Sequence, residues 1–535
     1  MAHPFDGLDR LVALAEPLAD AWSSRALAST TVGRERAVLR AMGVVGLARD
    51  GRPLAWSVVD RWLADMPAGL GAGIALPFAM AMLEYDGPSQ SIALDVASGA
   101  IELAMEAKLL DESDRRAAAE AAVESLDRAA RDRIDANRTA RGELTALLGD
   151  APTPGLGLRL QAQATRDALD EAGALVGGGA DCLRVRVPTG RELAVRLLDH
   201  GGAELTNSDA RTVALAAADP ALGSLGDAGD DPSTVPVGSQ RGLAALRVRA
   251  DELAAKRGAY VRLATAAPAL SAPEQAVVAA FERIDLVEAD PFGEIVEVGV
   301  DPDRALADHA AAHRIHARSG VLLFVGPGPL VVAPDLARGL PSDPATRAGR
   351  ALALQLLSVR FARANGLEPP AIAVGVLPAW LLGEQDVATR AVAELALRRA
   401  LLPGHPLVIG GPDDDAGPEA RVTWRHLAAL GLAIAPDAAL VLRPAPAGEE
   451  TGLDHRAAAR VAAGVATGTE PPVLRGAAAD HATATIAAAA ATLERLTGEG
   501  WATILGPGPA ELVRAGLGGD AVAERTERLA LLDDR

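Results

Sequence analysis

The chain has 535 residues, of which 49% are hydrophobic and 23% charged, a balance that fits a folded protein of one to three domains. Its formal net charge of −19 argues against a nucleic-acid or anionic-membrane surface, because both need clustered lysine and arginine. A single cysteine, Cys182, excludes a disulfide framework and a thiolate metal cluster.

The beginning of the chain carries no targeting signal that we recognise. The residues MAHPFDGLDR lack a basic stretch followed by an apolar one, so we expect no signal peptide. The apolar stretch at 69–82 is too short and too rich in glycine to span a bilayer. We therefore expect a cytoplasmic protein that does not bind membranes.

Residues 1–150 have the pattern of a helical accessory region. Apolar residues recur every three to four positions in several segments, which is typical of amphipathic helices. The segment APTPGLG at 151–157 contains helix-breaking residues and predicts the boundary of the next domain. The segments with helical spacing are 8–22, 33–42, 56–65 and 115–133.

From about residue 180 the pattern changes to short apolar runs that alternate with longer amphipathic segments. Eight such runs with helices between several of them predict a parallel TIM (β/α)8 barrel at 151–450, in which strands covered on both sides look continuously apolar. Ala-rich helical segments predict a C-terminal helical region at 451–535. The eight runs are 183–187, 260–264, 284–287, 294–298, 321–325, 371–376, 406–410 and 439–443.

Lysine is rare: Lys108 and Lys256 are the only two among 52 basic residues. Both stand in charged helical segments and are predicted to lie on helix surfaces. A mechanism that needs a Schiff-base lysine therefore has two candidates in this chain.

Three blocks carry a resemblance to a known family. They read STTVGRERAVLRAMGVVG at 29–46, NRTARGEL at 137–144 and YVRLATAAPALSAPEQAVVAAFERID at 260–285. In this order and at these separations they resemble the large alpha subunit of lysine 5,6-aminomutase, as a divergent member. The resemblance implies a TIM barrel and an isomerase that moves an amino group in lysine or a related diamino acid. It also implies adenosylcobalamin and pyridoxal phosphate, with a small cobalamin-binding beta-type subunit that supplies the Schiff-base lysine.

The resemblance also implies positions for the cofactor. The family's aromatic against the pyridoxal ring falls near Phe292, and we expect cofactor binding by Phe292, Arg262 and Asp290. Family residues that serve the pyridoxal or its phosphate fall on Val187, Glu192 and Pro268, which cannot make the same hydrogen bonds. We assign no catalytic residue from the sequence.

These replacements leave two alternatives to an active aminomutase. The first is a divergent, non-catalytic paralogue that keeps the barrel and acts as a binding or assembly partner. The second is a barrel enzyme with a new active site that uses Glu192, Asp290 and Arg262.

Two further motifs have a structural interpretation beside a functional one. His309, His313 and His316 share one helical face and could bind a divalent ion, but a polar outer face of a barrel helix is the favoured interpretation, so no metal site is predicted. The GPGP motif at 326–329 could bind phosphate through its backbone, but a tight loop is favoured because proline removes two donors.

Overall fold

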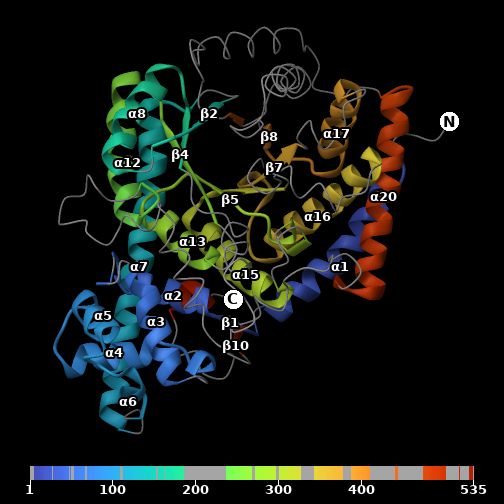
Figure 1. Cartoon of the computed structure of the whole chain (residues 1–535). Helices are drawn as coiled ribbons and strands as arrows, with labels where there is room; N and C mark the ends of the chain where they lie inside the picture. The colour runs from blue at the N-terminus through green and yellow to red at the C-terminus, as the bar shows by residue number, and fades with distance from the viewer. Residues whose placement is uncertain are drawn as a thin grey trace.

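The structure is a computed structural model of the whole chain, shown in Figure 1. The residues that it describes are 5–26, 28–46, 48–49, 53–66, 69–108, 112–151, 155–162, 164–185, 237–267, 271–293, 295–296, 301–326, 343–376, 387–409, 440–443, 474–501, 517–518 and 529–533.

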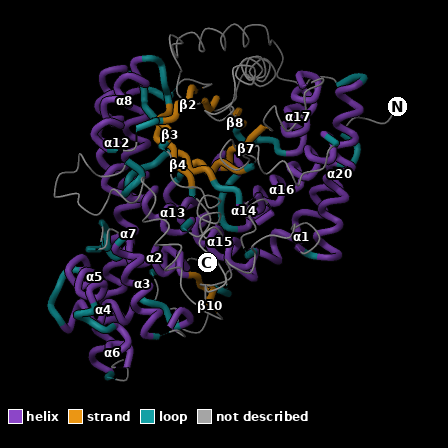
Figure 2. Tube along the Cα trace, in the orientation of Figure 1, coloured by secondary structure: helices purple, strands orange, loops and turns teal. Residues whose placement is uncertain are grey.

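A closed barrel of parallel strands forms the centre of the molecule, as the TIM-barrel prediction required. Each strand pairs with the next one along the chain, and β9 returns to pair with β2. Figure 2 shows these strands curving around a common axis with helices outside them. The strands are β2 Gly155–Arg159, β3 Cys182–Arg184, β4 Arg262–Ala266, β5 Leu286–Glu288, β6 Leu322–Val325, β7 Ile372–Val376, β8 Leu407–Ile409 and β9 Leu440–Arg443.

Seven of the eight predicted runs overlap a strand, and the run at 294–298 does not. Ile295 and Val296, the described residues of that run, follow the short helix α14 (Pro291–Gly293) and belong to no strand. A parallel strand needs a crossover connection, and the segment between β5 and this run is too short to supply one. The eighth strand is β2, which lies in a segment that we expected to be a break. The sequence did not reveal this strand because its alternating glycines have a low strand propensity.

Side chains on the strands alternate between two environments. Leu263, Val287 and Leu323 face outward and pack in the large core beneath the helices. Cys182, Ala264, Leu286, Phe324, Ala373 and Val408 form a separate buried cluster, which fills the inside of the barrel. Burial raises the pKa of the Cys182 thiol to about 12, so this cysteine is a core residue and not a nucleophile.

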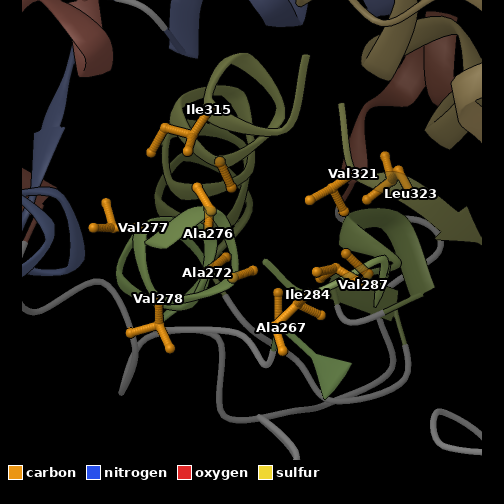
Figure 3. Close-up of a cluster of buried hydrophobic side chains, with 14 of the residues drawn as sticks. Ala267, Ala272, Ala276, Val277, Val278, Ile284, Val287, Ile315, Val321 and Leu323 are labelled. Carbon is orange, nitrogen blue, oxygen red and sulfur yellow. The ribbon is translucent and has the colours of Figure 1, made fainter. Parts of the chain in front are cut away.

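Helices cover the outside of the barrel between successive strands. Several begin at a side-chain cap, such as Ser239, Asp301 or Asp343, and two end at a glycine with a positive φ, Gly258 and Gly320. Figure 3 shows how residues of α13 and α15 lie close to the outward residues of the neighbouring strands. The barrel helices are α8 Thr165–Gly177, α12 Gln240–Arg257, α13 Ala272–Phe281, α15 Pro302–Ser319, α16 Pro344–Ala364 and α17 Val387–Leu401.

The remaining helices lie outside the barrel helices: α1, α2, α7, α20 and α22 pack on them directly, and α3, α4, α5 and α6 pack on α2, α7 or one another. Helix α1, near the start of the chain, lies beside α16 and beside α20, which is near the end of the chain (Figure 1). Helix α2 packs against α13. Strands β1 (Thr30–Thr31) and β10 (Leu517–Gly518) form a small antiparallel pair. No described helix is long and apolar enough to cross a membrane. These helices are α1 Leu8–Ala26, α2 Val32–Ala41, α3 Leu54–Asp65, α4 Ala75–Glu84, α5 Ser89–Ser98, α6 Leu103–Lys108, α7 Ser113–Leu148, α20 Ala477–Glu499 and α22 Ala530–Asp533, with the 3-10 turns η1 Gly69–Gly71 and η7 Pro369–Ala371.

The block NRTARGEL lies on α7 and binds the base of the barrel. The Asn137 amide donates to the Ala280 and Phe281 carbonyls at the end of α13. The Arg141 guanidinium donates to the carbonyls of Ser319 and Gly320 at the end of α15. The block therefore caps two barrel helices, since the last carbonyls of a helix have no partner within it.

Candidate functional site

The mouth of the barrel, formed by the C-terminal ends of the strands, is where TIM barrels carry their chemistry. Arg184 ends β3 and Glu288 ends β5, and both point into the barrel because Cys182 and Leu286, two residues earlier, are inside it. The Arg184 Nη2 and Nε atoms lie 2.8 Å and 3.0 Å from Glu288 Oε1. Both residues are buried, so the mouth contains a desolvated ion pair.

The intervening strand makes this pair possible. β4 contributes Ala264 and Ala266 at the levels of Arg184 and Glu288, respectively. Their methyl side chains leave room for the long arginine side chain to lie across β4 and reach β5. Arg159, at the end of β2, adds a second, half-buried guanidinium on the inward side of its strand. Among the described residues, the side chains that point inward at the ends of β2, β3 and β5 are therefore two cations and one anion, and such a set can bind an oxyanion or a zwitterion.

Two polar side chains of the barrel helices, Gln355 and Arg398, bind the backbone at the ends of β6 and β7. The Gln355 amide of α16 donates to the Val325 carbonyl at 3.3 Å and the Gly375 carbonyl at 2.8 Å. Arg398 of α17 donates through Nε to the same Gly375 carbonyl at 2.9 Å and through Nη1 to Glu394 at 2.6 Å. These two side chains thus fix two strand ends at the mouth. Sequence periodicity does not identify them.

Asp290 lies just beyond the end of β5, on the mouth side. Its Oδ1 accepts hydrogen bonds from the Gly293 backbone N–H at 3.2 Å and from the Ser358 hydroxyl at 2.9 Å. The carboxylate is buried and joins α14 to α16. This position is within the mouth region, and these two hydrogen bonds are those of a structural cap.

Phe292 is completely buried in an aromatic cluster beside Asp290. Its ring centroid lies 5.5 Å from that of Trp22, 5.8 Å from that of Trp501 and 5.7 Å from that of Phe361. The contact with Trp501 is stacked and the contact with Phe361 is edge-on. Phe292 thus offers no exposed ring face to a ligand in this structure.

Arg262 occupies the other end of the barrel. It is the first residue of β4, and Ala264 pairs with Leu286, so Asp290 lies about six residues farther along the strand direction. At about 3.3 Å per residue, this places Arg262 and Asp290 roughly 20 Å apart. A new active site that uses both Arg262 and Asp290 would need them close together. The structure does not bring these two residues together. Val187, Glu192, Pro268 and the motif residues 327–329 lie outside the described residues.

From the sequence we expected the histidine face of α15 to be a polar outer surface. The structure shows that this prediction is wrong. His309, His313 and His316 are fully buried, because α1, α7 and α22 pack against α15. Burial and the neighbouring histidines lower the pKa of His313 well below its usual range, and burial with His309 lowers that of His316 to about 3. Among the described residues, no group of three or more His, Cys, Asp or Glu side chains is placed to hold a metal ion.

The Arg184–Glu288 pair was missed from the sequence. The run LRVRV shows arginine at alternate positions of an apolar strand, which was the available signal for inward-pointing charge. Its partner is 104 residues away, and no local pattern connects the two.

Comparisons with known proteins give a consistent family. A model described as the D-Lysine 5,6-aminomutase TIM-barrel domain of alpha subunit matches residues 6–204 and 237–412. The lysine 5,6-aminomutase alpha subunit of Acetoanaerobium sticklandii is 26% identical over 347 residues, which cover 65% of this chain and 59% of the relative. The lysine 5,6-aminomutase alpha subunit of Fusobacterium nucleatum is 24% identical over 381 residues, which cover 71% of this chain and 65% of the relative. The chain thus matches less than two thirds of the length of either relative.

A solved structure gives a more distant comparison. The crystal structure of dihydropteroate synthase from Anaplasma phagocytophilum with bound 6-hydroxymethylpterin-monophosphate has a TM-score of 0.36 and 12% identity. The alignment covers 58% of this chain and 98% of that chain. Similarity of this degree does not indicate a shared ligand or activity.

Proposed function

This chain belongs to the family of the D-lysine 5,6-aminomutase alpha-subunit TIM barrel, and from that membership we propose that it is the large subunit of a heteromeric aminomutase. The proposed reaction is the 1,2-migration of an amino group in lysine or a related diamino acid, with adenosylcobalamin and pyridoxal phosphate as cofactors. The observation that carries the proposal is the buried Arg184–Glu288 pair at the barrel mouth. A guanidinium beside a carboxylate suits the carboxylate and ammonium groups of a zwitterionic amino acid.

The positions of the two lysines support the proposal that a partner polypeptide is needed. Lys256 is exposed in the last turn of α12, which leads into the start of β4 at the base of the barrel. Lys108 ends α6 in the accessory region. Neither lysine lies at the mouth, so a Schiff base formed there needs a lysine from another chain. A small beta-type subunit that also binds cobalamin would supply it.

The described residues do not by themselves fit pyridoxal phosphate. Phe292 is the described residue that the resemblance assigns to the pyridoxal ring, and Trp22 and Trp501 cover it. This burial favours a second candidate function, in which the chain is a non-catalytic paralogue that keeps the barrel and assembles with a partner. Both candidates require association with another polypeptide.

The test is to purify the full chain together with a small cobalamin-binding beta-type subunit from the same genome. The complex is incubated with pyridoxal phosphate, reduced with borohydride and digested for mass spectrometry. An active aminomutase predicts a pyridoxyl label on a lysine of the partner, with none on Lys108 or Lys256, and conversion of a diamino acid. Arg184→Gln is expected to abolish this conversion, and Lys256→Arg is the control that should not change it.

The other outcomes separate the candidates. A stable complex without label or turnover supports the non-catalytic paralogue. No association between the two chains contradicts both candidates. A label on Lys256 would contradict the proposed origin of the Schiff-base lysine.

A further inference from the structure

The base of the barrel carries a pocket that the proposed function does not use. Its volume is about 230 Å³, and it lies between the first turns of α1, the last turn of α16 and the segment that leads from α17 into β8. These elements all lie near the starts of β7 and β8, at the end of the barrel opposite the mouth. Leu8 and Val12 contribute to an apolar wall, beside polar and charged side chains.

Two arginines one helical turn apart line the pocket. Arg360 Nη1 donates to Glu16 of α1 at 2.5 Å, so this guanidinium already has a carboxylate partner. Arg363 is exposed, and none of the described residues forms an ion pair with it. Burial lowers the pKa of Arg360, Glu16 opposes this effect, and the neighbouring Arg363 adds to it. Asp9 of α1 also lines the pocket. Since Glu16 pairs with Arg360, the guanidinium at the pocket without a carboxylate partner among the described residues is that of Arg363.

A histidine adds an unsatisfied polar atom. His405 lines the pocket and is only 5% exposed. Its Nδ1 lies 3.2 Å from the Pro403 carbonyl oxygen, which fixes Nδ1 as the protonated nitrogen of the neutral ring. The Nε2 atom is buried without a hydrogen-bond partner and is left as an acceptor. A buried acceptor without a donor is destabilising, so a bound group that supplies a donor would be favoured here.

We propose that this pocket is a binding site for a small organic acid that carries an oxyanion for Arg360 and Arg363 and a hydroxyl or amino donor for His405. The oxyanion can be a carboxylate or a phosphate, since arginine binds both through the same N–H groups. The apolar wall accommodates a short carbon chain, and the volume limits the ligand to a small metabolite. Because α1 forms one side of the pocket, the ligand would also join this helix to the barrel.

The experiment measures binding to the full chain by isothermal titration calorimetry at constant ionic strength and neutral pH. The probes are inorganic phosphate, L-lactate and propionate; the last two differ by the hydroxyl. Lactate is expected to bind about five- to tenfold more tightly than propionate, as one additional neutral hydrogen bond implies. If phosphate binds more tightly than lactate and propionate, the ligand is a phosphate compound. If lactate binds more tightly than phosphate, the ligand is a hydroxy or amino acid.

Substitutions locate the site. Arg363→Gln is expected to weaken binding of the preferred probe by roughly tenfold or more, because a charge-assisted hydrogen bond is lost. Arg363 is exposed, so this variant should fold as the wild type does. The control is Arg166→Gln, an identical charge change at an exposed position of α8. His405→Phe should remove the preference for lactate over propionate while propionate still binds.

Three results would overturn the proposal. The first is the absence of binding by all three probes at millimolar concentration, which would leave the arginines as charges that stabilise helix C-termini. The second is binding that Arg363→Gln does not weaken, which would place the site elsewhere. The third is equal weakening by Arg166→Gln, which would indicate attraction by overall charge alone.

Discussion

Arg141 donates its Nε–H to the Asp285 carboxylate at 2.8 Å, and this ion pair joins α7 to the base of the barrel just before β5. Asp285 also accepts from the Tyr260 hydroxyl at 2.9 Å and from Arg247 at 3.0 Å. Two of the three sequence blocks that resemble the family thus meet at one buried carboxylate. Their role is structural, because this contact lies at the end of the barrel opposite the mouth.

Asp285→Asn should therefore destabilise the protein strongly. Removing one partner from a buried charge network costs about 3–5 kcal/mol, because the remaining guanidinium groups stay buried. The control is Asp135→Asn, which breaks a half-exposed pair with Arg318 and should cost about 1 kcal/mol or less. Urea unfolding followed by circular dichroism measures both values. Equal losses in the two variants would contradict the prediction.

Gly326→Ala should be destabilising at the end of β6. Gly326 has a φ of 113°, and an added Cβ would lie 1.9 Å from Gln355 Nε2. The Gln355 side chain would have to leave the carbonyls that it binds, so we expect a loss of roughly 2–4 kcal/mol. Gly142→Ala is the control, inside the C-terminal part of α7, where nothing lies within 4 Å of the new methyl group. This control should stabilise by about 0.5–1 kcal/mol, as measured by thermal unfolding.

Acid should destabilise the protein through the buried histidines of α15. His316 has a pKa of about 3 in the folded protein, below the 6.5 of the unfolded chain. Because the folded pKa is the lower one, the unfolded state binds protons first, so stability is full above pH 6.5 and decreases as the pH falls toward 3. Each pH unit in this window costs about 1.4 kcal/mol for this histidine.

The variant His316→Leu should show a smaller loss of stability between pH 6.5 and pH 5, by about 2 kcal/mol, than the wild type. Chemical unfolding at several pH values measures the slope. Comparison at pH 8, where the neutral imidazole predominates in both states, gives the packing effect of the substitution alone. An unchanged slope in the variant would show that His316 is protonated in the folded protein.

Pyridoxal phosphate is expected to bind weakly to this chain alone. The resemblance places Glu192 and Pro268 where the family has hydroxyl donors to the phosphate, and Glu192 would repel it. Losing two or three charge-assisted hydrogen bonds would weaken binding on the order of a thousandfold. Glu192→Ser should strengthen binding in an absorbance titration with the partner subunit present. Micromolar affinity of the wild type would show that other residues form the pocket.

Periodicity in the sequence identified the barrel, because strands covered on both sides must be continuously apolar. The runs at 321–325 and 371–376 correspond closely to β6 and β7. Alternating Gly and Leu hid β2, since glycine contributes neither β-propensity nor apolar area. The same reasoning assigned α15 a polar outer face, because a single helix does not reveal what packs against it.

The sequence by itself determined seven of the eight barrel strands and the family of the chain, because both depend on local patterns of residues. Only the tertiary structure decided that Arg184 meets Glu288, that Trp22 and Trp501 cover Phe292, and that Arg262 and Asp290 lie far apart. Such contacts depend on the register of strands and on the packing of helices distant in the chain. Local periodicity specifies which face of an element is apolar, but it does not specify the partner of that face.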